Sequence, residues 1–297
     1  MLGVESSKEI SSIANKSEIP TINTFFNLKT ANELDRSFDV INASGVFFHL
    51  EELHSACEGI KSILKKKGVF VIQFLYMKSI VKNCAFDQIY HEHLLYYTIK
   101  TINFLLEIHD LKMFDAYFSP IHGGSIIGYI SHPGVYRKTK QLEKLEHHKK
   151  VSKCNVLSAY HAFAKKIIVM KKKNRHFLLS NKKKGKTIYG FGAPVKGNTL
   201  LNYFGINKEI IDCLVEKNPL RRGLFSPGMH IPRLLEDEIK QLQDIYNVLA
   251  WKIKNKMLDY IQKLLEHRVK FIFQLILNNY HENIHNRRFW ILRKSFY

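Results

Sequence analysis

The first part of the chain alternates short apolar runs with longer stretches in which apolar residues recur at helical spacing. Apolar runs bounded by polar or glycine-containing segments are typical of buried strands, and apolar residues three and four positions apart are typical of helices. Ser6 or Ser7 is expected to cap the first helix and Gly68 to end the second. The patterns predict strands at residues 2–5, 38–44 and 69–74 and helices at residues 6–16 and 51–68. This alternation indicates βαβ units and a parallel sheet covered by helices.

Two more apolar runs follow, at residues 111–120 and 124–131, and we expect them to form antiparallel strands that close the sheet. The stretch at about residues 138–180 is rich in Lys, Glu and His and has helical character throughout. It is expected to connect the two halves of the chain.

The second half repeats the strand and helix pattern on a smaller scale. Residues 186–205 predict a strand, a glycine-containing turn and a helix. Further strands are expected at residues 210–219, 244–251 and 268–273, with a helix after the second of these. The predicted fold class is therefore α/β, with a second, smaller α/β domain. The tail at residues 274–297 continues neither pattern, and we assign it no function.

The chain is strongly basic, with 46 Lys and Arg against 26 Asp and Glu and a net charge of +20. Such an excess fits nucleic acid, an anionic membrane surface, anionic small substrates, or a lysine-rich surface without a specific partner. Many of the charges lie at residues 171–174 and 181–186, at the expected end of a helix, where cations are electrostatically favoured. No nucleic-acid motif accompanies them, so we favour the last interpretation.

The cysteines and the apolar segments exclude several other classes. The four cysteines stand singly and form no CxxC pair, so neither a disulfide framework nor a cysteine-based zinc site is expected. No run approaches the roughly 18 apolar residues of a membrane span. The first residues show no basic segment followed by an apolar core, so no signal peptide is expected. The predicted location is a reducing cytoplasm.

Four consecutive residues, Tyr90, His91, Glu92 and His93, follow the strand expected at residues 69–74. A solvated loop is one interpretation, and a proton-transfer site is the other, because histidine is the natural general base near neutral pH and an adjacent carboxylate can orient it. In an extended segment His91 and His93 would share one face and Tyr90 and Glu92 the other. If the segment coils, three of the four can converge. A metal site is weaker, since HEH is not HExxH and no third ligand has an expected spacing.

Two further candidates stand at the ends of predicted strands. Glu5 ends the first strand, and an acid after a strand of a nucleotide-binding fold can accept hydrogen bonds from ribose hydroxyls. A capping or surface carboxylate is the likelier interpretation of Glu5 from local pattern alone. His49 follows the strand at residues 38–44, where parallel sheets bind ligands, but a structural histidine that caps the next helix fits the spacing equally well.

The segment GFGAPVKGN, residues 190–198, has three glycines after a predicted strand, but it matches neither GxGxxG nor the P-loop pattern. Open backbone amides at a helix start, together with Lys196, would suit a phosphate, and a tight turn with packing glycines is the alternative. SPGMHIP, residues 226–232, is a turn that carries His230 between two prolines.

Together these segments resemble one family, the sugar C-methyltransferases. The resemblance covers about residues 1–273, and its longest motifs are FDQIYHEH, SPIHGGSI, YGFGAPVKGNTLLNYFGI, VEKNPLRRG and SPGMHIP, in the family's order and spacing. Members are class I S-adenosylmethionine-dependent enzymes that methylate carbon 3 of nucleoside-diphosphate 4-keto-deoxyhexoses. The resemblance implies a Rossmann-like methyltransferase domain and a smaller Rossmann-like domain that helps to hold the nucleotide sugar. We expect these at residues 1–120 and 121–273, followed by an irregular tail at residues 274–297.

The resemblance also implies roles for individual residues. His93 would be the general base that removes a proton next to a ketone, with Tyr90 and Glu92 positioning the substrate or stabilising the enolate. His49 would lie beside the enolate oxygen, and Glu5 would hold the cofactor ribose. The expected contacts to the sugar nucleotide are Lys196, Asn198 and His230. The implied cofactor is S-adenosylmethionine, the implied partner is a nucleotide-sugar substrate, and neither nucleic acid, a membrane nor a metal is expected.

The chain departs from the family plan in several places. The family's N-terminal zinc domain, its first strand and its glycine-rich cofactor loop have no counterpart here, so we expect an N-terminally truncated member. Ser44 and Gly45 stand where many members have asparagines. A degenerate, catalytically inactive chain is therefore the alternative to an active enzyme, and a basic module for nucleic acid ranks last.

Overall fold

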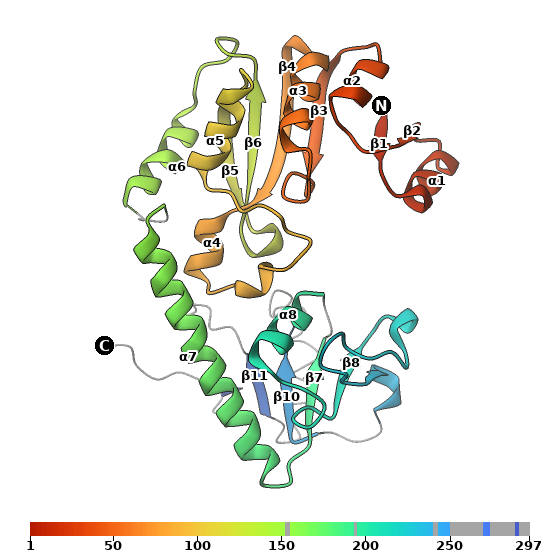
Figure 1. Cartoon of the computed structure of the whole chain (residues 1–297), viewed down its shortest axis with the longest axis vertical. Coiled ribbons are helices and arrows are strands. Elements are labelled where there is room, and N and C mark those ends of the chain that lie inside the picture. Colours follow the sequence, from red (N-terminus) through yellow and green to blue (C-terminus); the bar gives the residue numbers. More distant parts are fainter. Residues whose placement is uncertain (152–154, 193–194, 240–242, 250–269, 274–288, 291–297) are drawn as a thin grey trace. The chain divides into compact units, whose positions relative to one another are not determined.

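A computed structural model describes residues 1–151, 155–192, 195–239, 243–249, 270–273 and 289–290. The chain forms two compact units (Figure 1), here called unit 1 and unit 2. Unit 1 comprises Met1–Lys78 and His91–Asn155, and unit 2 comprises Ser79–Tyr90 and Val156–Tyr297. Each is described by itself. The domain boundaries expected from the sequence were taken from the segments that resemble the family, and they stay a prediction.

Unit 1 begins with a small parallel sheet built around one helix. Strand β1 (Gly3–Glu5) pairs with β2 (Thr21–Asn23), and α1 (Lys8–Lys16) connects them. The hydroxyl of Ser7 accepts a hydrogen bond from the Ile10 N–H at 3.4 Å and so caps α1. The predicted strand and helix are confirmed, and of the two candidate caps the structure uses Ser7.

The larger sheet of unit 1 has the order β3-β4-β6-β5 (Figure 1). Its strands are β3 (Phe38–Ser44), β4 (Leu64–Leu75), β5 (Lys112–Ser119) and β6 (Ser125–Ser131). Strands β3 and β4 run parallel, whereas β6 is antiparallel to both β4 and β5. The predicted βαβ unit and the antiparallel closing strands are therefore confirmed. The helices of unit 1 outside the small sheet are α2 (Leu28–Glu33), α3 (Leu53–Ile63), α5 (Ile99–Ile108) and α6 (Lys140–Val151), and α4 (Met77–Lys82) spans the boundary to unit 2.

The predicted end of the second helix is wrong. Helix α3 ends at Ile63, and Leu64 already has the extended angles that begin β4. Gly68 is a strand residue: a Cβ there would lie 2.9 Å from the Phe38 carbonyl oxygen and 2.8 Å from Leu64 Cδ1. This glycine therefore permits close approach of two segments rather than ending a helix.

Strand β3 lies at the edge of the larger sheet (Figure 1). Among the described strands it pairs with β4 alone, and the β1–β2 sheet forms no ladder with it. The Val40 side chain in this strand is 63% exposed, although the strand is mostly apolar. Unit 1 therefore contains two sheets that are not joined by backbone hydrogen bonds in the part of the chain described.

Unit 2 contains a parallel sheet with the order β12-β11-β10-β7-β8-β9. Its strands are β7 (Ile188–Phe191), β8 (Cys213–Glu216), β9 (Arg233–Leu235), β10 (Ile245–Val248), β11 (Lys270–Phe273) and β12 (Phe289–Trp290). The strands expected in the second half are confirmed, and two residues of the tail add β12. The helix expected after residue 251 lies outside the described residues.

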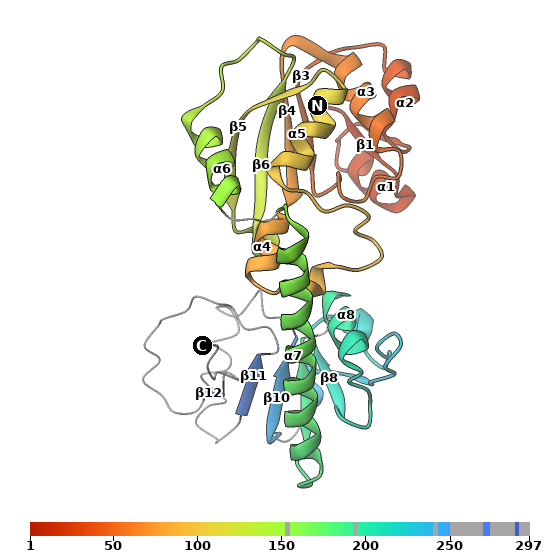
Figure 2. The same cartoon turned by 60° about the vertical axis from the view of Figure 1, so that its left-hand side comes forward.

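In the described part of unit 2, α7 (Leu157–Lys182) and α8 (Val195–Phe204) accompany this sheet, and α7 lies across one face of it (Figures 1 and 2). The single helix predicted at about residues 138–180 is wrong, because α6 and α7 are separate helices. Val156 has extended backbone angles, φ −116° and ψ 139°, which no helix can pass through.

Cys57, Cys84 and Cys213 are buried free thiols, and Cys154 lies outside the described residues. None of the helices that the structure describes is long and apolar enough to span a bilayer.

Candidate functional site

His93 is buried in unit 1, with 6% of its surface exposed, although it belongs to a polar loop. Its ring packs edge-on against Phe48, with the centroids 4.8 Å apart, and lies 5.2 Å from the ring of His49. The loop is thus not simply solvated at this point. The structure brings two of the predicted histidines together.

The loop that carries His93 is attached to the carboxyl ends of β3 and β4. The Leu94 N–H donates to the Phe48 carbonyl at 2.8 Å, and the Tyr97 hydroxyl donates to the Phe47 carbonyl at 3.0 Å, both in the segment after β3. The Met77 N–H, just after β4, donates to the Tyr97 carbonyl at 2.9 Å. Burial raises the pKa of Tyr97, so its phenol stays a proton donor. The site therefore lies where parallel strands usually place ligands.

His49 is exposed and is oriented by the backbone of Glu92. Its Nδ1 lies 2.5 Å from the Glu92 carbonyl oxygen. Because a carbonyl oxygen only accepts hydrogen bonds, Nδ1 must carry the proton. The other nitrogen, Nε2, is then the atom with which His49 can act on a ligand.

Of the four consecutive polar residues, the three that belong to unit 1, His91, Glu92 and His93, do not form one cluster. His91 is 86% exposed at its side chain, and its Nε2 lies 4.0 Å from the Glu92 carboxylate, which is itself 52% exposed. His93 is directed into the protein. Tyr90 is half-buried and is assigned to unit 2. Of the predicted catalytic residues, the structure thus brings together His49, His93 and the backbone of Glu92.

A buried polar pair at the same end of the sheet escaped the sequence analysis. Gln73 Nε2 donates to the Ser125 hydroxyl at 2.7 Å, and this hydroxyl donates to the Ile121 carbonyl at 2.9 Å. The Gly45 N–H donates to the Gln73 carbonyl at 3.3 Å. A glutamine inside an apolar strand, and the serine of SPIHGGSI, were the available signals. The pair fixes the loop before β6 against the ends of β3 and β4.

Glu5 lies at the end of β1, in the smaller sheet. One carboxylate oxygen accepts the Ser7 N–H at 2.7 Å, which is the local capping role that the sequence left open. No contact given by the described residues connects Glu5 to His49 or His93. The second oxygen makes no hydrogen bond within the described part of the chain.

In unit 2, Lys196 and Asn198 lie in the first turn of α8. Lys196 Nζ donates to Gln88 Oε1 at 2.6 Å, and Gln88 is 1% exposed in the short 3₁₀ helix η1 (Phe86–Gln88). The side-chain oxygen of Asn198 is buried and accepts no hydrogen bond from the described groups. Gln88, which contacts the predicted site residue Lys196, lies within the motif FDQIYHEH but was not singled out from the sequence.

The turn that carries His230 is attached to the same helix. Asn202 Nδ2 donates to the Pro227 carbonyl at 3.0 Å. Gly228, at φ +77°, leaves room for this contact, since a Cβ there would lie 2.1 Å from Asn202 Oδ1. His230 is exposed and has a positive φ of 52°. Helix α8 thus connects Lys196 and Asn198 to the turn of His230.

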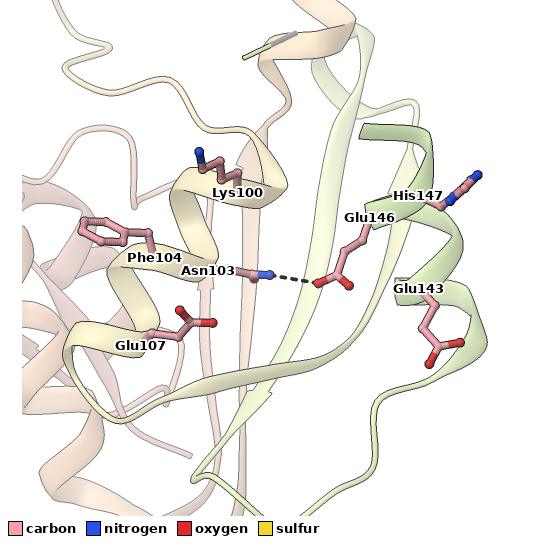
Figure 3. Close-up of a pocket in the computed structure, with 7 residues that line it drawn as sticks. All are labelled: Lys100, Asn103, Phe104, Glu107, Glu143, Glu146 and His147. Atoms are coloured by element: carbon pink, nitrogen blue, oxygen red, sulfur yellow. Dashed lines mark hydrogen bonds between the residues drawn. The ribbon is translucent and has the colours of Figure 1, made fainter. Parts of the chain in front are cut away.

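One cavity of unit 1 holds none of the predicted residues (Figure 3). It has a volume of about 510 Å³ and lies between α5 and α6. Its lining is rich in carboxylates, and Asn103 Nδ2 donates to Glu146 Oε1 at 3.1 Å across it. Among the described residues, no group of three or more His, Cys, Asp or Glu is placed to hold a metal ion.

The larger sheet of unit 1, in which parallel strands are followed by an antiparallel one, is typical of the class I methyltransferase type of α/β protein. Two family models match the chain: a methyltransferase domain at residues 1–72 and the C-methyltransferase C-terminal domain at residues 120–275. The chain belongs to the C-methyltransferase family. The expected fold class, and the expected enzyme class of methyltransferases that use S-adenosylmethionine, are confirmed at the level of the family.

A curated relative supports this assignment. The chain is 24% identical over 277 residues to the C-methyltransferase NovU of Streptomyces niveus. The match covers 92% of this chain and 66% of NovU, so the chain spans just under two thirds of the length of its relative.

Solved methyltransferases resemble part of the chain at a low level. Magnesium protoporphyrin IX methyltransferase ChlM from Synechocystis PCC 6803 is 11% identical, with a TM-score of 0.35 over 44% of this chain and 63% of its own. An S-adenosylmethionine-dependent methyltransferase from Clostridium acetobutylicum ATCC 824 is 14% identical, with a TM-score of 0.35 over 45% of this chain and 75% of its own. At these scores the likeness supports no conclusion about the site.

Proposed function

We propose that this chain is an S-adenosylmethionine-dependent C-methyltransferase that acts on a nucleotide-linked keto-deoxysugar through an enolate. The observation that carries the proposal is His93, buried beside His49 at the carboxyl ends of two parallel strands. The similarity to NovU supports the C-methyl chemistry. The sugar class rests on the resemblance of the sequence motifs, and a cytoplasmic location stays a prediction.

The proton-transfer step uses His93. A carbon next to a ketone becomes a nucleophile only after it loses a proton, and a ring nitrogen of His93 takes that proton. The electron pair left on the substrate would then take up the methyl group that bound S-adenosylmethionine would supply. His93 then returns its proton to solvent. A general base contributes typically about 10²- to 10⁴-fold to the rate.

His49 is the proposed partner of the enolate oxygen. Its Nδ1 is engaged by the Glu92 carbonyl, so Nε2 must carry a second proton to donate to that oxygen. The backbone of Glu92, rather than its exposed carboxylate, sets the direction of the ring.

The proposed cofactor fits unit 1 in part. S-adenosylmethionine, when bound, supplies a methyl group on a sulfonium, and the sulfur leaves as a neutral thioether. The second carboxylate oxygen of Glu5 makes no hydrogen bond in the described part of the chain and could accept one from a ribose hydroxyl. No other described residue is assigned to the cofactor.

Unit 2 carries the proposed contacts to the sugar nucleotide. The buried oxygen of Asn198 can accept a hydrogen bond from a sugar hydroxyl, which would satisfy an otherwise unpaired acceptor. Lys196 can exchange its contact with Gln88 for a phosphate oxygen. His230 lies in the turn that is hydrogen-bonded to α8 through Asn202, and it is the third proposed contact to the sugar nucleotide.

Solvent exchange at the sugar carbon tests the role of His93. In deuterated water, the full chain with S-adenosylhomocysteine and a nucleoside-diphosphate 4-keto-deoxyhexose should incorporate deuterium next to the ketone. His93→Asn should abolish this incorporation, because it removes the base. The matched control is His91→Asn, which alters an exposed histidine two residues away and should change nothing. Retained exchange in His93→Asn would remove His93 from the base role.

One observation favours the alternative, a member that has lost activity. Glu5 belongs to a sheet that is not hydrogen-bonded to the sheet of the histidines, so no ladder fixes the proposed cofactor contact relative to the proposed base. Calorimetry with S-adenosylmethionine separates the two readings. Saturable heat supports the enzyme, and an absence of heat at high protein concentration supports the inactive chain.

A further inference from the structure

A second cavity, in unit 2, lies between α7 and α8 and has a volume of about 530 Å³, within the usual size of a small-molecule site. Residues of α7 at helical spacing line it together with one residue of α8: Ile168, Lys171, Lys172, Arg175 and Tyr203. We call it the α7–α8 pocket. It lies apart from the Lys196–Gln88 contact, because Tyr203 follows Lys196 by seven residues on α8, about 10 Å along the axis.

The charge of this pocket is not compensated by either helix. Helix α7 contains lysines, an arginine and no Asp or Glu over its 26 residues, and α8 contains no acid either. At the last turn of α7, Lys182 forms an ion pair with Asp212. Like charges three and four residues apart destabilise a helix. An anion in the pocket would relieve this repulsion.

Arg175 is held in place with donors to spare. Its Nη1 donates to the carbonyls of Phe204, at 3.0 Å, and Gly205, at the end of α8. Nε and Nη2 make no hydrogen bond in the described part of the chain. A guanidinium that is already oriented loses little freedom when it binds a phosphate.

The remaining lining residues are apolar or aromatic. The Tyr203 ring is packed against Phe86, with centroids 5.4 Å apart, and the residue is still 44% exposed. The ammonium of Lys171 lies 4.9 Å from the centroid of this ring. Ile168 is 46% exposed beside it. A flat aromatic group can therefore lie against Ile168 and Tyr203 while the neighbouring cations bind its anionic part.

We propose that the α7–α8 pocket is an accessory binding site for a nucleoside diphosphate. The phosphates lie between Lys172 and Arg175, Lys171 turns from the Tyr203 ring to the phosphates, and the base rests on Tyr203 and Ile168. Charge-assisted hydrogen bonds to phosphate are among the strongest in proteins, and aromatic faces stack on any base. In this proposal, Lys171 and Lys172 bind phosphates, whereas the sequence alone favoured a lysine-rich surface without a specific partner. The site is independent of methyl transfer.

Calorimetry with uridine diphosphate and the full chain tests the proposal. The double variant Lys171→Ala with Lys172→Ala should weaken binding about tenfold or more, the equivalent of about 1.4 kcal/mol. The matched control is Lys165→Ala with Lys166→Ala, which removes the same charge from exposed positions of the same helix outside the pocket. The control should change the dissociation constant less than about twofold, since exposed charges at a distance are screened.

Two further variants locate the nucleotide. Tyr203→Phe keeps the ring and should bind normally, whereas Tyr203→Ala should weaken uridine diphosphate binding more than binding of inorganic phosphate. Lys196→Ala should remove only binding at the proposed substrate site and should leave a saturable phase, which the double variant Lys171→Ala with Lys172→Ala weakens. Thermal melting of each variant checks that it is folded.

Several results would overturn the proposal. An absence of saturable binding would do so directly, as would equal weakening by the two double variants, which would mean non-specific attraction by charge. Loss of binding in Lys196→Ala would move the nucleotide to the proposed substrate site. Tighter, competitive binding of a short DNA duplex would make the surface a nucleic-acid site instead. None of these results depends on methyl transfer, so the two proposals fail separately.

Discussion

The imidazole of His49 has one nitrogen fixed and one available, and this asymmetry governs what a substitution can preserve. Nδ1 donates to the Glu92 carbonyl, so the atom that meets the substrate is Nε2. Glutamine places its amide nitrogen near the position of Nε2, and asparagine places it near that of Nδ1. The two variants therefore separate the two nitrogens.

We expect His49→Asn to lower kcat by about 10²-fold, the usual cost of one lost donor to an oxyanion. His49→Gln should lose clearly less, because its amide can still donate to the enolate oxygen. The measurement is kcat and KM for methyl transfer in both variants. Equal losses in kcat would contradict donation by Nε2, and a change confined to KM would assign His49 to substrate binding.

His109 is a second buried histidine, and no role in the proposed chemistry is assigned to it. It is 7% exposed, and its Nε2 lies 2.8 Å from His54 Nδ1. Burial lowers the pKa of His109, the neighbouring His54 lowers it further, and Glu58, 3.8 Å away, opposes the shift. The folded protein thus prefers the neutral ring more than the unfolded chain does.

This difference predicts a loss of stability in acid. Below the unfolded value of 6.5, the unfolded chain takes up a proton at this position before the folded protein does, so the free energy of unfolding falls as the pH drops from about 6.5 to the lowered pKa. Urea midpoints at about pH 7.5 and about pH 5.5 measure the fall. His109→Gln keeps a polar partner for His54 and should show a smaller difference between the two midpoints. An undiminished difference would assign the acid sensitivity to groups other than His109.

The individual site residues were predictable to different degrees. His49 and His93 were found because histidines after strands are unusual enough to notice, and the structure places their rings 5.2 Å apart. Their catalytic roles stay a prediction. The opposite exposures of His91 and His93 were not predictable, because a loop has no period that assigns faces. Gln73 escaped because its partner, Ser125, is distant in sequence.

At the scale of the elements, Gly68 is a position where a side chain is opposed by close packing rather than by the backbone conformation. It lies in β4, and a Cβ would press against the Phe38 carbonyl at 2.9 Å and the Lys65 carbonyl at 3.0 Å. These are backbone atoms that cannot turn aside. Gly68→Ala should therefore lower the free energy of unfolding by about 1–3 kcal/mol, the usual cost of overpacking.

Gly134→Ala is the matched control, since its surroundings are open to 4 Å and only its φ of +80° opposes a side chain. We expect it to cost about 1 kcal/mol, less than the change at Gly68. Chemical denaturation of both variants measures the two costs. Equal costs would show that β3 and β4 separate readily at this point.

Long elements with a clear period were predicted well, and short or interrupted ones were not. Strand β3, helix α3 and strand β4 follow from periodicity, whereas the three-residue strands β2 and β9 are too short to show one. The residues on both sides of Val156 are compatible with a helix, so the sequence pattern gives no sign that the helix is interrupted there. Gly68 shows that a glycine needed for close packing looks like a helix end when only the sequence is available.

At the scale of the whole molecule, the two sheets of unit 1 should respond differently to a protease. The β1–β2 sheet has no ladder to the larger sheet, and the connection between them includes Phe25, which is 73% exposed. Just beyond, Asn27 and Leu28 are anchored by hydrogen bonds to Glu52 and Ser55. The accessible stretch is therefore short and follows β2.

Limited digestion with chymotrypsin should cut first after Phe25, because exposed segments with few backbone hydrogen bonds open most easily. Mass spectrometry of the first fragments identifies the site. Phe70 and Phe74, which are 0% exposed in β4, are matched residues of the same specificity and should resist. A first cut elsewhere in unit 1 would show that the small sheet is held more firmly than its backbone pairing suggests.

One side of β3 has no strand partner in the described part of the chain, so the backbone amides of unit 1 should exchange with solvent at very different rates. Amide hydrogens that bridge β4 and β6 are shielded on both sides, and in heavy water they should persist for hours. Those on the outward side of β3 meet solvent directly and should be replaced within seconds. A hydrogen-exchange map of this protein would show slow exchange in the centre of the larger sheet and fast exchange along the outer edge of β3. Any molecule that binds along this edge would lower the exchange rate of the β3 amides.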